Sequence, residues 1–460
     1  MSFSLKGKRI LIIGFGKSGI AAFETIVREG TIPAVYDDRD IIKEDPGLYE
    51  KLKKAGAESF LNGKPAPEGA WDMFVLSPGV PPSLPFIEKA RNAGVKIIGE
   101  LELAYILGRG KYIAITGTNG KTTTTTLISE MFPAAGLKAV ACGNIGRPVV
   151  TESVRADDDT WLVTEVSSFQ LETIDRFRPE IAVLLNITPD HMDRHKTMKN
   201  YAEAKARIYE NQEAGDFFVY NADDELAASL AAGARSRKLP FSRRKILEKG
   251  AYVRDGMIVF AGGEKEEPVN IIRTDALMIP GLHNLENALA GAAVSFAAGI
   301  GPETIAKTLK SFKGVEHRIE FVSEINGIRF VNDSKGTNPD ASVKAIEAIG
   351  DKILLIAGGY NKDADFSEYI RTAKGRVKKL ILLGDTAGIM KECALNGGFE
   401  EKDILMTGGM EEAVRLGYEC AGDGDTVLLS PACASWDMYE NYEERGADFK
   451  TAVKNLEVRE

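Results

Sequence analysis

Short runs of apolar residues alternate with helix-length segments from one end of the chain to the other. The runs have the length of strands and occupy residues 9–13, 74–76, 112–116, 161–166, 181–187, 352–357, 380–383 and 426–429. They are largely apolar at consecutive positions rather than at alternate ones, so both faces of each strand are expected to be buried. Strands of this kind between helices are typical of parallel sheets covered on both faces. The pattern therefore predicts an α/β fold.

Three of the runs lead directly into glycine turns, with the sequences IIGFGKSG at 12–19, ITGTNGKT at 115–122 and IAGGYNK at 356–362. Each turn is expected to belong to its own sheet, which predicts three domains. We place the first boundary near Gly99, after a strand at 95–98, and the second near Lys313, between a helix and the next strand. The predicted domains are 1–99, 100–313 and 314–460, without a repeat of fixed period.

Composition and charge restrict the partners. Among 460 residues, 58 are basic and 67 acidic, and the net charge of -9 argues against a nucleic-acid protein with a general basic face. The longest apolar stretch, 288–301, is shorter than the roughly 20 residues that span a bilayer. No signal-peptide core precedes the first strand and the cysteines form no CxxC pair, so we expect a cytoplasmic protein without a zinc site or disulfides.

The first glycine turn, Gly14 to Gly19, has the GxGxxG spacing of a dinucleotide fingerprint, and Asp37 and Asp38 end the next strand-like run. Glycines let backbone N–H groups and a helix N-terminus approach a phosphate closely. The turn predicts a phosphate site, with a turn needed only for strand–helix packing as the alternative. Its residues do not distinguish NAD from a nucleotide sugar.

The second turn, Gly117-Thr118-Asn119-Gly120-Lys121-Thr122, follows a strand and opens a helix. Its N–H groups, the Lys121 ammonium and the Thr122 hydroxyl suit a polyphosphate with Mg²⁺. The standard P-loop has glycine where this chain has Ile115, so the turn is a compact variant. We predict that it binds ATP.

Polar residues follow two strands expected beside this turn. Glu165 is the best candidate for a magnesium-binding carboxylate, and His191 lies between two aspartates in the segment TPDHMD. The alternative for His191 is a turn or capping role. His195, four residues further on, is expected to be a surface residue.

Other candidates carry weaker signals. Lys205 lies in the expected helix 201–211, and spacing alone indicates a solvated side chain. Asn284 and Asn287 share a helix face and are candidates to read a base edge, with capping as the alternative. The segments NDSKGTNP at 332–339 and SPACASWD at 430–437 are either sites at strand ends or turns.

Together these segments resemble the Mur ligases, and among them the members that add D-glutamate during peptidoglycan synthesis. The resemblance spans the whole chain and rests on GFGKSG, SPGV, GTNGKT, GNIG, EVSSFQLE, DHMDRH, YAEAKARIYEN, GLHNLENALA, HRIE, NDSKGTNP and SPACASWD. VSSFQLE and SPACAS are the pieces typical of the D-glutamate members. GTNGKT alone would also admit the folylpolyglutamate synthetases.

The resemblance implies a Rossmann-like N-terminal domain for the UDP-sugar, a central P-loop ATPase-type domain, and a Rossmann-like C-terminal domain for the amino acid. For the UDP-sugar it implies contacts from Ser18, Arg39, Ser77, Asn144 and His191. Asp38 stands where relatives often have threonine, which leaves uracil recognition open.

The resemblance also implies roles in binding ATP, metal and amino acid. For ATP these fall on Gly117, Thr118, Asn119, Gly120, Lys121, Thr122, Asn284, Asn287, Arg318 and Asp333. Two Mg²⁺ sites are implied, one at Thr122 and Glu165 and one at His191 and a carbamylated Lys205. Lys335 is implied to lie near the transferred phosphate, and the D-glutamate pocket to consist of Thr337, Lys362, Ser435 and Tyr442.

The implied activity is ATP-dependent amide formation between UDP-N-acetylmuramoyl-L-alanine and D-glutamate through an acyl phosphate, with Lys121, His191, Lys205 and Lys335 at the reaction centre. We expect a monomer that binds small molecules, without nucleic acid or membrane insertion. The alternatives are another ATP-dependent amide ligase, an NAD-dependent oxidoreductase that uses the first glycine turn, and a P-loop switch that only binds ATP.

Overall fold

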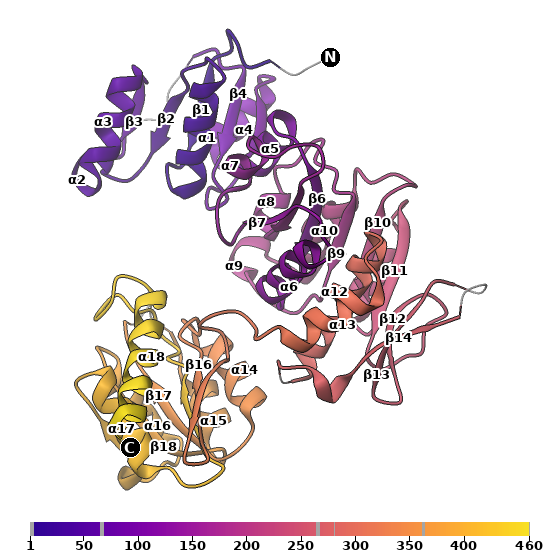
Figure 1. The fold of residues 1–460 in the computed structure, drawn as a ribbon. Coiled ribbons are helices and arrows are strands. Elements are labelled where there is room, and N and C mark those ends of the chain that lie inside the picture. The colour runs from indigo at the N-terminus through magenta and orange to yellow at the C-terminus, as the bar shows by residue number, and fades with distance from the viewer. Residues whose placement is uncertain (1–3, 65–68, 264–266, 280, 361–363, 460) are drawn as a thin grey trace. The chain divides into compact units, whose positions relative to one another are not determined.

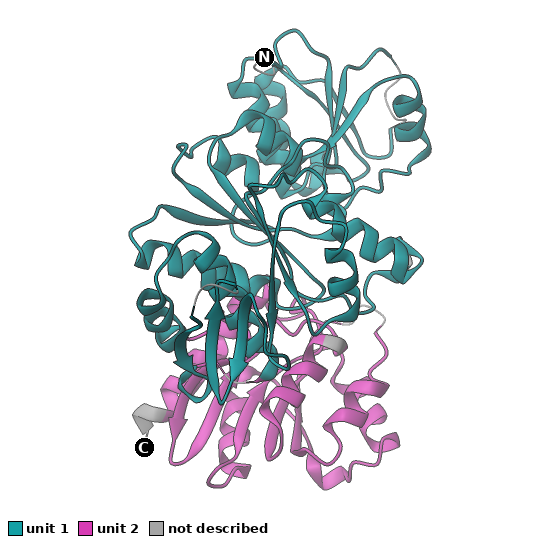
Figure 2. Ribbon diagram, turned by 90° about the vertical axis from the view of Figure 1, so that its right-hand side faces the viewer, with its two compact units in different colours: residues 1–277, 282–312 teal, residues 278–281, 313–460 magenta. Residues whose placement is uncertain are grey.

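The computed structural model describes residues 4–64, 69–263, 267–279, 281–360 and 364–459. The chain forms two compact units, coloured separately in Figure 2. Unit 1 comprises residues 1–277 and 282–312, and unit 2 comprises residues 278–281 and 313–460. Two sheets belong to unit 1 and one to unit 2 (Figure 1), which confirms the predicted α/β class. No helix in the described ranges has the length and apolar character needed to cross a membrane.

The first sheet is entirely parallel, in the order β3-β2-β1-β4-β5. Its strands are β1 (Ile10–Ile13), β2 (Ala34–Asp37), β3 (Ser59–Leu61), β4 (Met73–Leu76) and β5 (Lys96–Gly99). Its helices are α1 (Lys17–Arg28), α2 (Ile41–Glu44), α3 (Pro46–Ala55) and α4 (Pro85–Asn92). All residues of β1 and β4 are buried, as their apolar runs predict. The strand order reverses at β1, so the first glycine turn lies where such sheets place ligands.

The second sheet has the order β14-β13-β12-β11-β10-β9-β6-β8-β7. Its strands are β6 (Lys111–Thr116), β7 (Ala139–Gly143), β8 (Trp161–Glu165), β9 (Ile181–Leu184), β10 (Phe217–Asn221), β11 (Arg237–Ser242), β12 (Gly250–Arg254), β13 (Met257–Ala261) and β14 (Val269–Arg273). Strands β6 to β12 pair in parallel. Strands β13 and β14 extend the sheet in the antiparallel direction, which the sequence pattern did not predict.

Helices cover the second sheet. The helices between residues 100 and 311 are α5 (Glu100–Leu107), α6 (Lys121–Ala134), α7 (Val149–Ser153), α8 (Ser168–Leu171), α9 (Met192–His195), α10 (Met198–Ala206), α11 (Glu225–Ala231), α12 (Leu282–Ala297) and α13 (Pro302–Ser311), of which α5 also packs on β4 and β5 of the first sheet. Helix α12 is buried from Asn287 to Ser295 because its residues there are mostly small and apolar. It packs on α6 so closely that a Cβ on Gly291 would lie 2.9 Å from Leu127.

The third sheet has the order β15-β16-β20-β17-β18-β19 and is parallel except for β15. Its strands are β15 (Glu320–Ile325), β16 (Ile328–Asn332), β17 (Ile353–Ala357), β18 (Val377–Leu382), β19 (Ile404–Met406) and β20 (Thr426–Leu429). Its helices are α14 (Pro339–Ile349), α15 (Ser367–Ala373), α16 (Ala387–Asn396), α17 (Met410–Cys420) and α18 (Tyr442–Arg459). The loops after β16, β17 and β20 meet at the carboxyl edge, where the polar motifs of the third domain lie.

Candidate active site

The first glycine turn joins β1 to α1 and depends on two of its glycines. Gly14 has a φ of +83°, which favours glycine. A Cβ on Gly19 would lie 2.1 Å from the carbonyl oxygen of Gly14, so strand and helix approach more closely than a side chain permits. Ser77, directly after β4, donates its hydroxyl to the same carbonyl over 2.7 Å. The turn is therefore held from the neighbouring strand.

Asp37 closes this turn from β2. Its Oδ2 accepts the N–H of Phe15 at 2.6 Å, and its carboxylate also accepts the backbone N–H, Nε and Nη2 of Arg39. Burial pushes the pKa of Asp37 upward, but the hydrogen bonds from Arg39 and Phe15 outweigh burial and keep the pKa below its usual value. In a dinucleotide protein this acid would bind the ribose hydroxyls. Here the Asp37 carboxylate is already hydrogen-bonded to Phe15 and Arg39, which disfavours the oxidoreductase alternative. The Arg39 side chain is half exposed, and Ser18 lies in the first turn of α1.

The second glycine turn, residues 117–120, joins β6 to α6. Gly120 has a φ of +84°, and a Cβ there would lie 2.3 Å from Asn287 Oδ1. Asn119 donates its backbone N–H to Asn186 Oδ1 over 2.8 Å, so the loop after β9, the strand paired with β6, fixes the turn. Lys121 Nζ donates to the carbonyls of Gly117 and Thr118 over 2.9 and 2.8 Å. The turn thus has a helix N-terminus and a lysine at one place, as an anion site requires.

Lys205 is buried, and the expectation of a solvated side chain was wrong. Only 1% of its surface is exposed, and its Nζ donates to the Gly117 carbonyl over 2.8 Å. Burial, reinforced by the charge of Lys121, lowers the pKa of Lys205 well below its ordinary value. Helix α10 presents Lys205 to the glycine turn because that face of α10 packs inward, a contact that spacing along one helix does not reveal. Lys121 and Lys205 therefore both donate to the Gly117 carbonyl of the second glycine turn.

Glu165 ends β8 opposite Ile115 of β6, beside the second turn. It is 2% exposed, and its Oε1 accepts Asn144 Nδ2 at 2.8 Å. Its Oε2 is buried and finds no hydrogen-bond partner among the described residues. An unpartnered buried oxygen is costly, and carboxylate and hydroxyl oxygens are the donors that Mg²⁺ prefers. Glu165 and the buried Thr122 thus fit a magnesium ion.

Within the described ranges, no group of three or more His, Cys, Asp or Glu side chains is placed to hold a metal by itself. A magnesium ion at Glu165 would take its other ligands from phosphate oxygens and water.

The two histidines after β9 differ in their surroundings. His191 has a φ of +53°, is half exposed, and lies 3.6 Å from Asp190 and beside the Phe169 ring. His195 was expected on the surface but is 6% exposed and stacks on Phe169. Its Nε2 is hydrogen-bonded to Ser168 Oγ at 3.0 Å. His195 is therefore a core residue that ties the VSSFQLE segment to α9 and α10, while His191 stays available to a ligand.

Asn284 and Asn287 lie at the start of α12 and are buried. Asn287 Nδ2 donates to Asn284 Oδ1 over 3.1 Å, and Thr124 Oγ1 donates to Asn287 Oδ1 over 3.2 Å. The two side chains share one face, as predicted from their spacing. Through Thr124 and Gly120 they belong to the surroundings of the second glycine turn.

In unit 2 the NDSKGTNP segment follows β16. Asp333 is 4% exposed, accepts Ser430 Oγ at 2.7 Å, and burial raises its pKa to about 7. The positive charge of the half-buried Arg318 acts against that rise. Lys335 Nζ lies 5.7 Å from the centre of the Tyr442 ring. The predicted nucleotide residues Arg318 and Asp333 and the predicted catalytic Lys335 thus occur in one part of unit 2.

A pocket of about 230 Å³ lies in the same unit. Its lining includes three of the four predicted amino-acid residues, and consists of Thr337, Ala434, Ser435, Trp436, Asn441, Tyr442 and Glu443. The fourth, Lys362, lies outside the described residues. Segments almost one hundred residues apart in the sequence therefore form a single pocket that offers two hydroxyl-bearing side chains and one phenol.

Known proteins match nearly the whole chain. Profiles described as "Mur ligase MurD-like, N-terminal domain", "Mur ligase middle domain" and "Mur ligase, glutamate ligase domain" match residues 8–99, 115–295 and 317–433. A protein of Thermoanaerobacter sp. (strain X514) is 49% identical over 98% of this chain and 99% of its own. One of Pelotomaculum thermopropionicum is 51% identical over 98% of both chains. Both are named UDP-N-acetylmuramoylalanine--D-glutamate ligase.

The chain belongs to the Mur ligase family. Solved structures agree on the fold. The UDP-N-acetylmuramate-alanine ligase of Thermotoga maritima has a TM-score of 0.57 at 17% identity and covers 98% of this chain and 100% of its own. A solved UDP-N-acetylmuramoyl-L-alanyl-D-glutamate--2,6-diaminopimelate ligase has a TM-score of 0.57 at 17% identity, over 85% of this chain and 93% of its own. Membership makes the chain an ATP-dependent ligase and excludes the oxidoreductase and switch alternatives.

Two residues of this Mur ligase were missed in the sequence. Asn186 binds the second glycine turn, its side chain accepting the N–H of Asn119 and donating to the Asn119 carbonyl over 3.1 Å. Arg445 lies buried in α18 and binds the loops that carry Ser334 and Ala434. Asn186 is a polar residue inside the predicted apolar strand 181–187, and that position was the available signal. Arg445 gave none, because a lone arginine in a charged helix indicates a solvated face.

Proposed function

We propose that the chain joins D-glutamate to UDP-N-acetylmuramoyl-L-alanine with cleavage of ATP to ADP and phosphate. The names of relatives about 50% identical over nearly the full length support this substrate pair. The single observation that carries the proposal is the pocket of unit 2, where Thr337, Ser435 and Tyr442 converge. Hydroxyl groups donate hydrogen bonds to carboxylates, and D-glutamate presents two of them.

The reaction needs activation because a carboxylate resists attack by an amine. A carboxylate oxygen of the L-alanine residue attacks the γ-phosphorus of ATP, an O–P bond forms, and the bond to ADP breaks. The amine of D-glutamate then attacks the acyl carbon, a C–N bond forms, and phosphate leaves as the amine loses its proton. The first step brings two anions together. Lys121 and Lys335 are the cations that offset this repulsion.

The UDP-sugar is assigned to the first glycine turn. Arg39 is half exposed and fixed by Asp37, so its guanidinium can meet a ligand at little entropic cost. Ser18, Ser77 and Asn144 add hydrogen-bonding groups, and His191 orients the reacting end rather than acting as a committed base. The ATP phosphates are assigned to the second turn, with Asn284, Asn287, Arg318 and Asp333 for the rest of the nucleotide.

Magnesium fits Thr122 and Glu165, and it would supply positive charge that offsets the negative charge of the phosphates. A second ion at His191 and Lys205 fits only if Lys205 is carbamylated, because an ammonium or amine is no ligand for Mg²⁺. The depressed pKa of Lys205 favours this change, since only the uncharged amine attacks CO₂. The N–C bond then forms and a proton leaves.

Carbamylation of Lys205 predicts one slowly exchanging carbamate signal in the ¹³C NMR spectrum of protein equilibrated with ¹³C-bicarbonate at pH 8. The signal should vanish in Lys205→Met and persist in Lys199→Met, an exposed lysine of the same helix. A spectrum without the signal, or an unchanged one in Lys205→Met, would contradict carbamylation.

The proposed function is tested by phosphate release from Mg-ATP. The assay compares UDP-N-acetylmuramoyl-L-alanine alone, D-glutamate alone, both together, and both with L-glutamate in place of the D isomer. We expect release only with both substrates and the D isomer. Release indifferent to D-glutamate would overturn the proposal. We further expect a cytoplasmic protein that is a monomer, and light scattering checks the monomeric state.

A further inference from the structure

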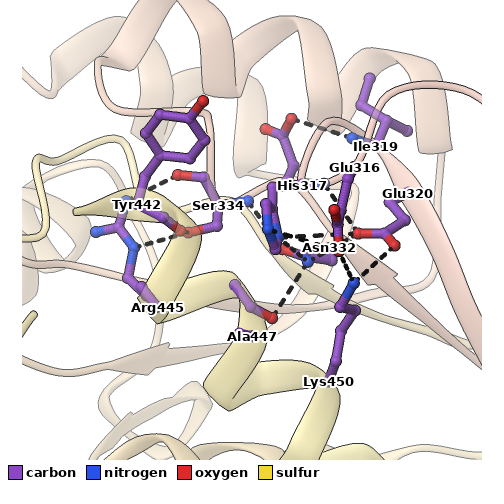
Figure 3. A network of polar contacts seen from close by, with 12 residues as sticks. Glu316, His317, Ile319, Glu320, Asn332, Ser334, Tyr442, Arg445, Ala447 and Lys450 are labelled. Atoms are coloured by element: carbon purple, nitrogen blue, oxygen red, sulfur yellow. Dashed lines mark hydrogen bonds and ion pairs between the residues drawn. The ribbon is translucent and has the colours of Figure 1, made fainter. Parts of the chain in front are cut away.

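Arg445 lies in the first turn of α18 and is 3% exposed. Its guanidinium donates from all three nitrogens, and Figure 3 shows it beside Ser334 and Tyr442. Nε donates to Ser334 Oγ over 3.0 Å and Nη2 to the Ser334 carbonyl over 2.8 Å. Nη1 donates to the carbonyls of Cys433 and Ala434, each over 3.1 Å. These acceptors lie on the loops after β16 and β20, so one side chain joins two loops to α18.

A third loop packs on the same guanidinium. A Cβ on Gly359, just after β17, would lie 3.2 Å from Arg445 Nη1 and 2.3 Å from the Ala434 carbonyl. Gly359 has a φ of +139°, and the next residue, Tyr360, donates its N–H to the Ala434 carbonyl over 2.9 Å. The three loops at the carboxyl edge of the third sheet therefore meet at Arg445.

Each described residue proposed to receive the amino acid is close in sequence to one of these contacts. Thr337 follows Ser334 by three residues, Ser435 directly follows Ala434, and Tyr442 precedes Arg445 by three residues in the same helix. Ser334 Oγ also donates to the Tyr442 carbonyl over 2.8 Å. Arg445 itself does not line the pocket, so its influence passes through the loops that it holds.

The charge of Arg445 has no direct counterion. Its four hydrogen-bond acceptors are three carbonyl oxygens and one hydroxyl, and no ion pair in the described part of the chain includes it. Asp437 and Asp333 act on it only through space. Burying a cation without a paired carboxylate is costly. An anion bound in the nearby pocket would be attracted by the Arg445 charge and would offset part of that cost. Glu443, which lines the pocket, would repel such an anion, so a nearby cation is needed to offset this repulsion.

We propose that Arg445 is a positioning residue for the amino-acid substrate, which fixes the three loops around the pocket and provides positive charge for a dicarboxylate. The inference rests on the proposed function and assigns a determinant of its amino-acid specificity. It concerns the amino-acid pocket, whose lining includes none of the residues assigned to ATP or to the UDP-sugar.

The test compares Arg445→Met, Arg445→Lys and Arg415→Met in steady-state assays of the full-length enzyme with each substrate varied in turn. Arg415 is the matched control, because it lies on α17 of the same unit and forms a surface ion pair with Glu419. For Arg445→Met we expect KM for D-glutamate to rise at least roughly 30-fold, with KM for ATP and the UDP-sugar within about twofold. Arg445→Lys keeps the charge but not the planar fork, so a rise of about three- to tenfold is expected. Arg415→Met should match wild type.

Equal losses for all three substrates, or an unchanged KM for D-glutamate, would overturn the inference. If Arg445→Met lacks cooperative thermal unfolding, Arg445→Lys decides by the same criterion. A wild-type enzyme that does not need D-glutamate would instead overturn the proposed function, and this inference with it. The two failures are therefore distinguishable.

Discussion

The two glycine turns of unit 1 have similar sequences and opposite surroundings. Each turn follows a strand, β1 or β6, that has a parallel neighbour on both sides. Each turn leads into a helix through the sequence Gly-Lys-Ser or Gly-Lys-Thr. Lys121 folds back onto its own turn, whereas Lys17, at the corresponding place, donates to the distant Gly146 carbonyl over 2.5 Å. The first turn is closed by the carboxylate of Asp37, and the second is occupied by Lys121 and Lys205.

A glycine turn of this kind supplies backbone N–H groups but not the charge that selects a ligand. In the first case that charge comes from Asp37 at the end of β2 and from Arg39, and in the second case from Lys121 at the start of α6 and from Lys205 of α10. An acid with a half-exposed arginine suits a ligand read by hydrogen bonds, such as a nucleotide sugar. Two lysines suit a polyphosphate.

The largest expected effect separates the two lysines. Lys121→Met should lower kcat by roughly 10³-fold or more, because it removes a cation at the site of phosphoryl transfer. Lys17→Met should stay within about threefold of wild type. The measurement is phosphate release with all three substrates at saturation, and equal losses in the two variants would contradict the distinction.

The two turns also differ in what a methyl group would meet. Gly120→Ala places a Cβ 2.3 Å from Asn287 Oδ1 at a φ of +84°, and we expect KM for ATP to rise about 100-fold. Gly16 has a φ of −81° and open space around its Cβ position, so Gly16→Ala should be nearly silent. Steady-state kinetics with ATP varied distinguish them. A silent Gly120→Ala would show that the turn is not a phosphate site.

The smallest effect concerns the first turn. Arg39→Met should raise KM for the UDP-sugar about tenfold, the usual consequence of losing a charge-assisted hydrogen bond, and leave KM for ATP unchanged. Arg28→Met, an exposed arginine at the end of α1, is the control. If Arg39→Met raised KM for ATP and left KM for the UDP-sugar unchanged, the assignment of the two turns would be reversed.

The sequence was sufficient to predict the elements whose signal is local. Both glycine turns, the shared face of Asn284 and Asn287, and the parallel strands β1, β2, β4, β5, β6, β8, β9, β17, β18 and β20 follow from runs and spacings within a few residues. The parallel strands β3, β7, β10, β11, β12 and β19 were not predicted. The antiparallel strands β13 and β14 escaped because an edge extension carries no motif. The roles of the individual residues stay predictions.

Residues whose role depends on long-range packing were missed or wrong. Lys205 and His195 were expected in solvent, yet both are buried, because another segment covers the face on which they lie. Arg445 was not singled out, since its partners lie up to 111 residues away. Burial of a polar side chain depends on contacts between distant elements, and periodicity along one helix holds no record of them.

The assignment of the two turns to different ligands is tested most directly by calorimetric titration of Lys121→Met and Arg39→Met, each with Mg-ATP and with UDP-N-acetylmuramoyl-L-alanine. We predict that each variant loses affinity for only one ligand and that this ligand differs between the two variants. Lys121→Met should lose ATP binding and bind the UDP-sugar within about threefold of wild type, and Arg39→Met should bind ATP normally but the UDP-sugar about tenfold more weakly. Loss of both ligands in either variant, or the reverse pairing, would contradict the assignment of the two turns to different ligands.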